Sequence, residues 1–233
     1  MKTPADLIVE RAAASDIPVD PAVAEAIAGV LDAMLAEPQN LSSVRDIDQA
    51  VWVHAVDSLS GLRVPAVREA TSIVDIGSGN GFPGLALAAA LPAVPVTLVE
   101  SEKSKADWLR RASAAFPNVR VVADRSETLA RDEREAFSVA CARAVGSLPV
   151  VMELAAPLVA PGGHLVAWRG RREADDEALA LLAGGELGLT PTPDIAVTPI
   201  PGVSRYFSVW EKAESTPDRY PRRPGMAAKR PLA

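Results

Sequence analysis

The stretch SIVDIGSGNGFPG, residues 72–84, decides the fold of this chain. Its first half is a short apolar run, which is typical of a buried strand. In its second half Asp75, Gly77, Gly79 and Gly81 follow the spacing D-x-G-x-G-x-G. Glycines let the backbone turn sharply and approach a ligand closely, because they carry no Cβ. In doubly wound sheets ligands bind at the carboxyl ends of strands, so the stretch predicts a strand followed by a ligand-binding turn.

Alternation of strands and helices continues from this turn towards residue 213. Short apolar runs alternate with segments of helical periodicity, and prolines or glycines separate them. This alternation predicts an α/β fold with a Rossmann-like, doubly wound and mostly parallel sheet with right-handed crossovers. We expect strands at 72–77, 96–101, 119–124, 137–145, 162–170 and 204–213, and helices at 85–91, 105–116, 150–158 and 178–183.

Helical periodicity also precedes the turn. Apolar residues recur at a spacing near 3.6 between residues 3 and 37, and Pro18 and Pro21 divide this region into two helices. A third helix is expected to begin after Asp46 or Asp48 and to run through Leu59. We therefore expect three parts: an N-terminal helical extension (1–62), a cofactor-binding Rossmann-like domain (63–213) and a basic C-terminal tail (214–233).

The composition is that of a globular protein. Apolar residues make up 48% of the 233, enough for one domain with a sizeable core. No apolar run reaches the ~18 residues of a membrane span, and the first residues lack the layout of a signal peptide. A single cysteine, Cys141, allows neither an intrachain disulfide nor a metal cluster. We expect a cytoplasmic monomer with no membrane partner and no metal.

Charge is unevenly distributed along the chain. The net charge is −6, yet residues 217–233 carry +4 and the remainder −10. Composition alone favours a solvated, disordered end for this segment. The alternative is a basic arm that contacts an anion while the body of the protein stays acidic.

The glycine turn favours an adenosyl ligand over a dinucleotide. A dinucleotide site requires G-x-G-x-x-G, but position 82 is Phe, and the next helix begins with Pro83-Gly84. Glu100 ends the second expected strand, where a carboxylate can accept hydrogen bonds from both ribose hydroxyls.

Asp124 and then Ser126-Glu127 end the third expected strand, where the adenine edge would lie. Each acid alone could be an ordinary residue at a strand end. Their succession after the glycine turn favours S-adenosylmethionine, and so a methyltransferase. Phe82 could shield the methionine part of that ligand, or it could belong to the core.

Several stretches from about residue 40 onward resemble one bacterial family, the small-subunit ribosomal RNA methyltransferase G, also called glucose-inhibited division protein B. The Gly-Phe-Pro-Gly turn and the tail are the most specific of them, whereas the first 35 residues match only in being helical. The matching residues are Asn40-Leu41, His54, Asp57-Ser58-Leu59, VDIGSGNGFPGLALA (74–88), Ser126-Glu127, Arg143 and YPRRPGMAAKRPL (220–232).

This resemblance implies a class I methyltransferase that methylates N7 of one guanine in the decoding region of 16S ribosomal RNA, with 16S RNA or the 30S subunit as partner. It also implies that Gly77, Phe82, Ser126, Glu127 and Arg143 contact the cofactor. Where this chain has Arg169, the family often has lysine. Guanine N7 carries a free lone pair, so catalysis can come from positioning, and we expect no catalytic acid or base.

Basic residues are the candidates for gripping RNA, and each has a structural alternative. Arg143 could pair with a strand-end acid, and Arg171 and Arg172 could balance the acids that follow them. His54 and Asp57 could simply tie the N-terminal helices to the core. The residues that we predict to contact RNA are Arg169, Arg222, Arg223, Lys229 and Arg230.

Three rival functions remain open from the sequence. They are a methyltransferase for a small molecule or protein, a non-catalytic RNA-binding protein with an adenosyl pocket, and a nicotinamide dehydrogenase. The basic tail is the feature that discriminates between an RNA methyltransferase and the first of these rivals. Deleting residues 217–233 is expected to weaken methyl transfer to RNA and to leave the affinity for the cofactor intact.

Overall fold

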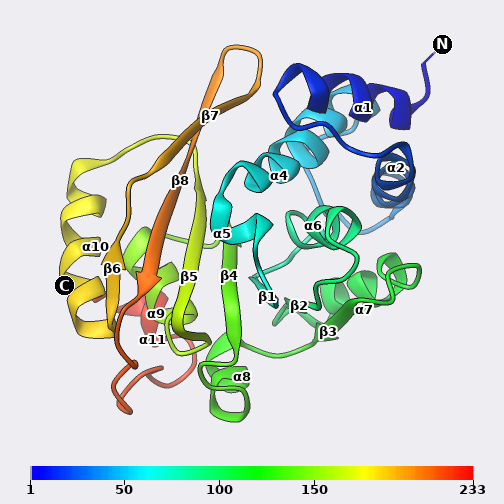
Figure 1. Ribbon diagram of the computed structural model, residues 1–233. Helices are drawn as coiled ribbons and strands as arrows, with labels where there is room; N and C mark the ends of the chain where they lie inside the picture. The colour runs from blue at the N-terminus through cyan, green and yellow to red at the C-terminus, as the bar shows by residue number, and fades with distance from the viewer. Residues whose placement is uncertain (1, 233) are drawn as a thin grey trace.

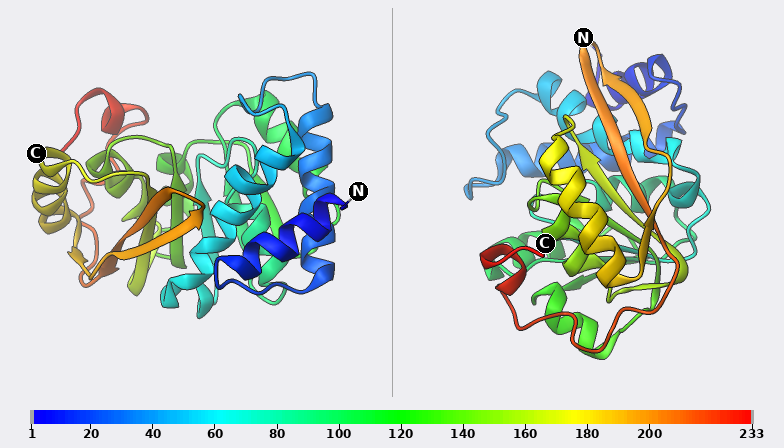
Figure 2. Two further views of the ribbon diagram at one scale, coloured as in Figure 1. Left: turned by 90° about the horizontal axis from the view of Figure 1, so that it is seen from above. Right: turned by 90° about the vertical axis from the view of Figure 1, so that its left-hand side faces the viewer.

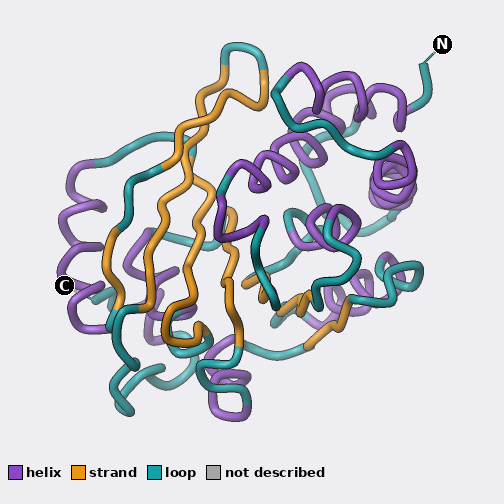
Figure 3. The backbone as a smooth tube through the Cα atoms, viewed as in Figure 1, coloured by secondary structure: helices purple, strands orange, loops and turns teal. Residues whose placement is uncertain are grey.

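The computed structural model describes residues 2–232 and contains one mixed, eight-stranded sheet (Figures 1 and 3). The strand order is β3-β2-β1-β4-β5-β8-β6, and β7 pairs with β8. Strands β1 to β5 are parallel, whereas β8 runs antiparallel to β5, β6 and β7. The strands are β1 (Ile73–Ile76), β2 (Val96–Val99), β3 (Val119–Val122), β4 (Phe137–Arg143), β5 (Val159–Arg169), β6 (Leu189–Pro191), β7 (Ile195–Ile200) and β8 (Val203–Lys212).

Helices cover both faces of the sheet, and this confirms the doubly wound α/β fold. Helices α6 (Gly84–Ala90) and α7 (Lys103–Ala112) pack on one face. The other face carries α8 (Ser126–Asp132), α9 (Leu148–Ala155) and α10 (Ala174–Leu187). All four residues of β1 are buried, because both of its faces are covered.

The N-terminal extension forms a helical layer on the α6 side of the sheet (Figures 1 and 2). Asp20 caps α2, and Pro21 occupies its first turn, as the sequence predicts. The third predicted helix begins at its N-cap Asp46 and continues to Arg63 through a π-helical stretch, η1. The extension comprises α1 (Pro4–Ala14), α2 (Pro21–Ala36), α3 (Ile47–Ala50), η1 (Val51–Val56), α4 (Asp57–Leu59) and η2 (Ser60–Arg63), and the short α5 (Pro65–Arg68) follows it.

Strands β6 and β7 are not predicted from the sequence. Strand β7 forms a hairpin with β8, and most of its residues are exposed or half-buried. Strand β6 is three residues long and lies at the sheet edge, where Pro191 is tolerated. Short edge strands give a weak sequence signal because little of their surface is buried.

The C-terminal segment is folded, in contrast to the solvated end that composition favours. Residues 213–232, which include α11 (Met226–Lys229), run beneath α9 and α10, on the side of the molecule opposite the N-terminal helices (Figure 2). Tyr220, Ala227 and Leu232 are buried there. Arg134 donates a hydrogen bond of 2.8 Å to the carbonyl oxygen of Tyr220. Among the described helices none is long and apolar enough to span a membrane.

Candidate active site

The glycine turn lies at the point where the sheet reverses its winding. Strands β1 and β4 are neighbours, and their crossover helices pack on opposite faces, so a crevice opens beyond their carboxyl ends. Gly77 has a φ of +65° and Gly81 a φ of +98°. A Cβ on Gly81 would lie 2.6 Å from Leu85, and one on Gly77 would lie 3.1 Å from Val145. Both conformation and space therefore require glycine at these two positions.

Asp75 supports the turn from below. Its side chain is buried, and Oδ2 accepts a hydrogen bond of 3.1 Å from the backbone N–H of Gly84. Burial raises the pKa of Asp75 to about 7. Oδ1 has no hydrogen-bond partner within residues 2–232. Asp75 lines neither of the two cavities beside the turn and supports the turn through Gly84, and a contact of Asp75 with the cofactor stays a prediction.

Two cavities meet at Gly77, one on each side of the turn. The rear cavity, on the α8–α9 side, has a volume of about 210 Å³. The front cavity, on the side of η1 and α6, has a volume of about 630 Å³. Front-cavity lining residues include His54, Asp57, Gly79, Phe82, Glu100 and Arg143; rear-cavity lining residues include Ile76, Val99, Ser126, Glu127, Val145 and Ala228.

The rear cavity suits a flat heterocycle with polar edges. Ile76, Val99 and Val145 form apolar walls from three different elements. Ser126 and Glu127, at the start of α8, provide polar groups at the far end, and both are buried. Apolar faces with a few polar groups at one edge are typical of small-ligand pockets.

Glu100 lines the front cavity next to the glycine turn. Only 8% of the residue is exposed, and its Oε2 accepts a hydrogen bond of 3.0 Å from the N–H of Gly79. Its Oε1 accepts one of 2.8 Å from the N–H of Glu102. An ionised carboxylate has about four acceptor sites, so each oxygen retains capacity for a hydroxyl donor. The contact of Glu100 with ribose stays a prediction, for which this free acceptor capacity leaves room.

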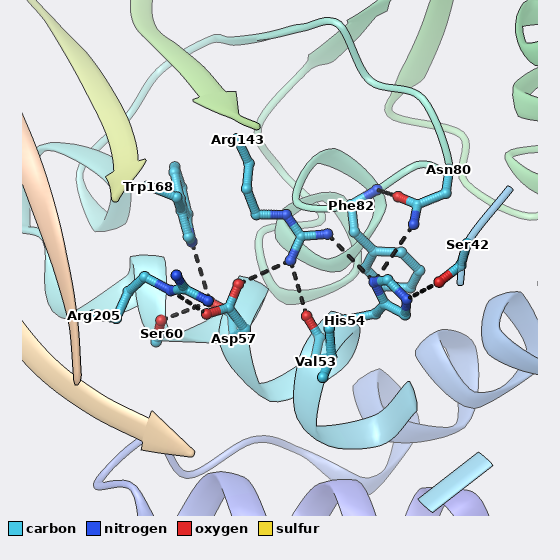
Figure 4. A network of polar contacts seen from close by, with 10 residues as sticks. All are labelled: Ser42, Val53, His54, Asp57, Ser60, Asn80, Phe82, Arg143, Trp168 and Arg205. Carbon is cyan, nitrogen blue, oxygen red and sulfur yellow. Dashed lines mark hydrogen bonds and ion pairs between the residues drawn. The ribbon is translucent and has the colours of Figure 1, made fainter. Parts of the chain in front are cut away.

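Arg143 belongs to a network that joins β4 to the N-terminal extension (Figure 4). Its Nη1 donates to Asp57 Oδ2 at 2.9 Å and to the carbonyl oxygen of Val53 at 3.0 Å. Arg205, from β8, donates through Nε to Asp57 Oδ1 at 2.7 Å. Asp57 is 1% exposed and therefore fully enclosed by these partners. Its pairing with Arg143 and Arg205 supports the alternative that Asp57 ties the extension to the core, and it shows that Arg143 pairs with a helical acid and not with one at a strand end.

His54 lines the front cavity as a neutral imidazole. Its ring stacks on Phe82 with centroids 5.6 Å apart, and its Nε2 lies 2.9 Å from Ser42 Oγ. Burial, with the charge of Arg143 as the second cause, lowers the pKa of His54 to about 4. Phe82 belongs to the core and also lines the front cavity, so the core interpretation is confirmed, and the shielding of a cofactor stays a prediction.

The predicted RNA contacts divide into two groups. Arg169 is ion-paired with Asp176, and Arg222 with Glu153, so these two guanidinium groups have structural partners and the prediction for them is revised. In contrast, Arg223, Lys229 and Arg230 are exposed. Arg171 and Arg172 form ion pairs with nearby acids, which supports the alternative that they balance the charge of those acids.

Sequence reasoning missed several residues of the site. Asn80 accepts a hydrogen bond of 3.2 Å from the N–H of Phe82, and Arg205 and Ala228 line the front and rear cavities. Glu153 is buried on α9. Its isolated position in the apolar run VVMELAAPL was the available signal, because a lone acid there predicts a buried charge that needs a partner.

Solved methyltransferase structures share this fold. A predicted O-methyltransferase of Agrobacterium tumefaciens superposes with a TM-score of 0.52, at 24% identity over 70% of this chain and 81% of that chain. Fibrillarin of Aeropyrum pernix, solved with natively bound S-adenosyl-L-methionine, gives a TM-score of 0.54 at 15% identity, over 67% of this chain and 73% of that chain. These likenesses show that the chain has the fold of class I methyltransferases, with the glycine turn at the end of β1.

Sequence comparison then identifies the family. The family model for rRNA small subunit methyltransferase G matches residues 32–181. Proteins named ribosomal RNA small subunit methyltransferase G are similar over most of the chain. The relative from Chloroflexus aggregans is 40% identical over 83% of this chain and 82% of its own, and that from Deinococcus radiodurans is 35% identical over 99% and 94%. The chain belongs to the ribosomal RNA small subunit methyltransferase G family.

Proposed function

We propose that this protein transfers a methyl group from S-adenosylmethionine to N7 of one guanine in the decoding region of 16S ribosomal RNA. The observation that carries the proposal is the pair of cavities that meet at Gly77, found in a chain of this family. The rear cavity is small and combines apolar walls with polar groups, and the front cavity is three times as large and lined by more polar side chains. The first suits the nucleoside of the cofactor, and the second suits its methionine end together with a base.

The residues present fit the cofactor. The rear cavity would hold adenine between Ile76, Val99 and Val145, with Ser126 and Glu127 at its polar edge. Glu100 would accept the ribose hydroxyls. Arg143 lines the front cavity beside the glycine turn, where its guanidinium would hold the methionine carboxylate.

S-adenosylmethionine, when bound, supplies an electrophilic methyl group on a sulfonium. Guanine N7 presents its own lone pair, so the chain has no proton to remove and contributes by orientation and exclusion of water. The stacked rings of Phe82 and His54 form an aromatic wall of the front cavity. Because His54 is neutral, it adds no positive charge near a base that becomes cationic on methylation.

RNA contact is proposed for the exposed residues Arg223, Lys229 and Arg230 and for the rim of the front cavity. In A-form RNA the edge that carries N7 faces a deep and narrow groove. The target base must therefore lie in a loop or leave its stack, at a cost of a few kcal/mol. The front cavity, at about 630 Å³, has room for a base beside the methionine end.

Labelled S-adenosylmethionine and 30S subunits that lack the modification provide the test. The expected result is incorporation at a single guanine, located by mass mapping of 16S RNA fragments, with N7 identified by its alkaline ring opening. Naked 16S RNA in a parallel reaction distinguishes the particle from the RNA as substrate. Cofactor binding without methyl incorporation into either RNA substrate would contradict the proposal and favour a non-catalytic RNA-binding protein. Methyl incorporation into a protein would instead favour a methyltransferase that acts on proteins.

A further inference from the structure

The C-terminal segment, residues 220–232, lies against the rear cavity. Gly225, Ala227 and Ala228 line this cavity opposite the strand residues Ile76 and Val99. Ala227 is buried, whereas Ala228 is exposed at the cavity edge. The segment therefore forms one side of the space that we assign to the cofactor's nucleoside.

A direct hydrogen bond joins this segment to a proposed cofactor residue. The N–H of Gly225 donates to Glu127 Oε1 at 2.8 Å, and Ser126 Oγ lies 3.5 Å from Glu127 Oε2. Glu127 is only 4% exposed, so water has little access to replace this donor. The position of the Glu127 carboxylate therefore depends on the docked segment.

Arg222 fastens the segment to the body of the protein. Its Nε and Nη2 donate to the two oxygens of Glu153 at 2.7 and 2.5 Å, a bidentate arrangement. Glu153 lies on α9 with 1% exposure, and no other Lys, Arg or His of residues 2–232 pairs with it. Nη2 also donates to the carbonyl oxygen of Arg230 at 2.7 Å. A buried carboxylate left without its partner is costly, so this pair strongly favours the docked segment.

The arginine just before this segment, Arg219, makes a much weaker contact. Arg219 lies 3.6 Å from Glu186, and both side chains are largely exposed, at 66% and 45%. Exposed ion pairs contribute little to stability. Arg219 is therefore a natural control for Arg222, because the two arginines are three residues apart in the basic tail and each is paired with one glutamate.

We propose that residues 220–232 form a wall of the cofactor site, latched by the Arg222–Glu153 pair, and that their docking sets the affinity for the nucleoside half of S-adenosylmethionine. This inference rests on the proposed cofactor site. It replaces the expectation that removal of residues 217–233 leaves cofactor affinity intact. A chain without the docked segment would expose the rear cavity to solvent and release Glu127 from Gly225.

Calorimetric titration of the full chain with S-adenosylmethionine, and separately with adenosine, tests this inference. Arg222→Met removes the latch, and Ala228→Phe places a large ring at the edge of the rear cavity without disturbing a buried residue. Each is expected to raise the Kd of both ligands about tenfold, or more. Arg219→Met should change either Kd by less than about twofold.

Thermal unfolding of Ala228→Phe, expected to match that of the unaltered chain, separates obstruction from loss of structure. Unchanged affinity in Ala228→Phe would overturn the inference whatever Arg222→Met does. An equal loss of affinity in Arg219→Met would overturn the role of the latch. If the unaltered chain binds neither ligand, the proposed cofactor site itself fails, and the inference falls with it.

Discussion

The front and rear cavities share Gly77 but are closed by segments from opposite parts of the chain. In front, η1 and α4 of the N-terminal extension bring His54 and Asp57 to the turn; behind, residues 220–232 bring Ala228. Each closing segment is ion-paired to the body of the protein through a buried carboxylate, Asp57 in front and Glu153 behind. The two carboxylates differ in their partners, since two arginines hold Asp57 and one holds Glu153.

This difference indicates how firmly each side is closed. Loss of one arginine leaves Asp57 with a second guanidinium, whereas loss of Arg222 leaves Glu153 with none among the residues that the structure describes. The front carboxylate thus keeps an arginine partner when one is lost, whereas the rear carboxylate does not. The front cavity is three times as large as the rear cavity. Closing the front side therefore does not determine the shape of the smaller rear cavity.

The largest effect is expected where the two cavities meet. Gly77→Asp introduces a Cβ near Val145 at a positive φ and adds a negative charge between the cavities. We expect the Kd for S-adenosylmethionine to rise at least about 100-fold, which calorimetry would show as the absence of measurable binding. Gly185→Asp is the matched control, because Gly185 lies in α10 with open space around it. Normal binding by Gly77→Asp would refute the site assignment.

Arginine removal compares the two buried carboxylates directly. Arg222→Met is expected to lower the free energy of unfolding by about 3 kcal/mol, the lower end of the range for breaking a buried ion pair. Arg205→Met should cost about 1 kcal/mol, because Asp57 keeps Arg143. Urea unfolding at pH 7 measures both values. Equal losses would show that the second arginine provides no redundancy.

Lowering the pH should reduce the free energy of unfolding through His54, which lines the front cavity. The pKa of His54 is lowered to about 4, below its ordinary value near 6.5, so between these pH values the unfolded chain binds more protons. Stability from this group therefore falls as the pH falls from 6.5 towards 4.

Between pH 6.5 and 4.5 the free energy of unfolding, measured with urea, should fall by about 2 kcal/mol less in His54→Asn than in the unaltered chain. Asp75, whose pKa is raised, contributes in the opposite direction, but it is present in both proteins and cancels in the comparison. His164→Asn, at the only other histidine, is the control for loss of an imidazole. Parallel pH profiles for His54→Asn and the unaltered chain would contradict the assignment.

The smallest effect is expected on the outer side of the C-terminal segment. Lys229→Ala removes one exposed charge and should weaken binding to 16S RNA by less than about fivefold. Its signature is a salt dependence of log K shallower by about 1, measured by filter binding over a range of salt concentrations. Ala228→Phe, one residue away, should leave that slope unchanged. An unaltered slope for Lys229→Ala would remove it from the RNA contacts.

Local signals in the sequence were sufficient for most of the fold. The parallel strands follow from their apolar runs and the turns between them, and the start of α2 follows from Asp20 and Pro21. Strands β6 and β7 were not predicted, because their pairing with β8 brings together residues distant in sequence and buries little apolar surface.

In the site, the positions of the glycine turn and of Glu100 could be predicted, because both directly follow predicted strands, whereas their contacts with a cofactor stay predictions. The pairings of Asp57 with Arg205 and of Glu153 with Arg222 could not, since each joins groups more than 60 residues apart. Charge counts identified the tail as basic but could not show which arginine faces inward. Arg222 and Arg223 are adjacent in sequence, yet one is ion-paired at Glu153 and the other is exposed.

The two sides of residues 220–232 have a thermodynamic consequence. One side faces the proposed cofactor pocket, and the other displays Arg223, Lys229 and Arg230 to a polyanion. A ligand on either side that favours the docked segment lowers the cost of docking for the other ligand. Linkage makes this reciprocal: if RNA tightens S-adenosylmethionine binding by some factor, S-adenosylmethionine tightens RNA binding by the same factor. Loss of either ligand would then weaken the binding of the other.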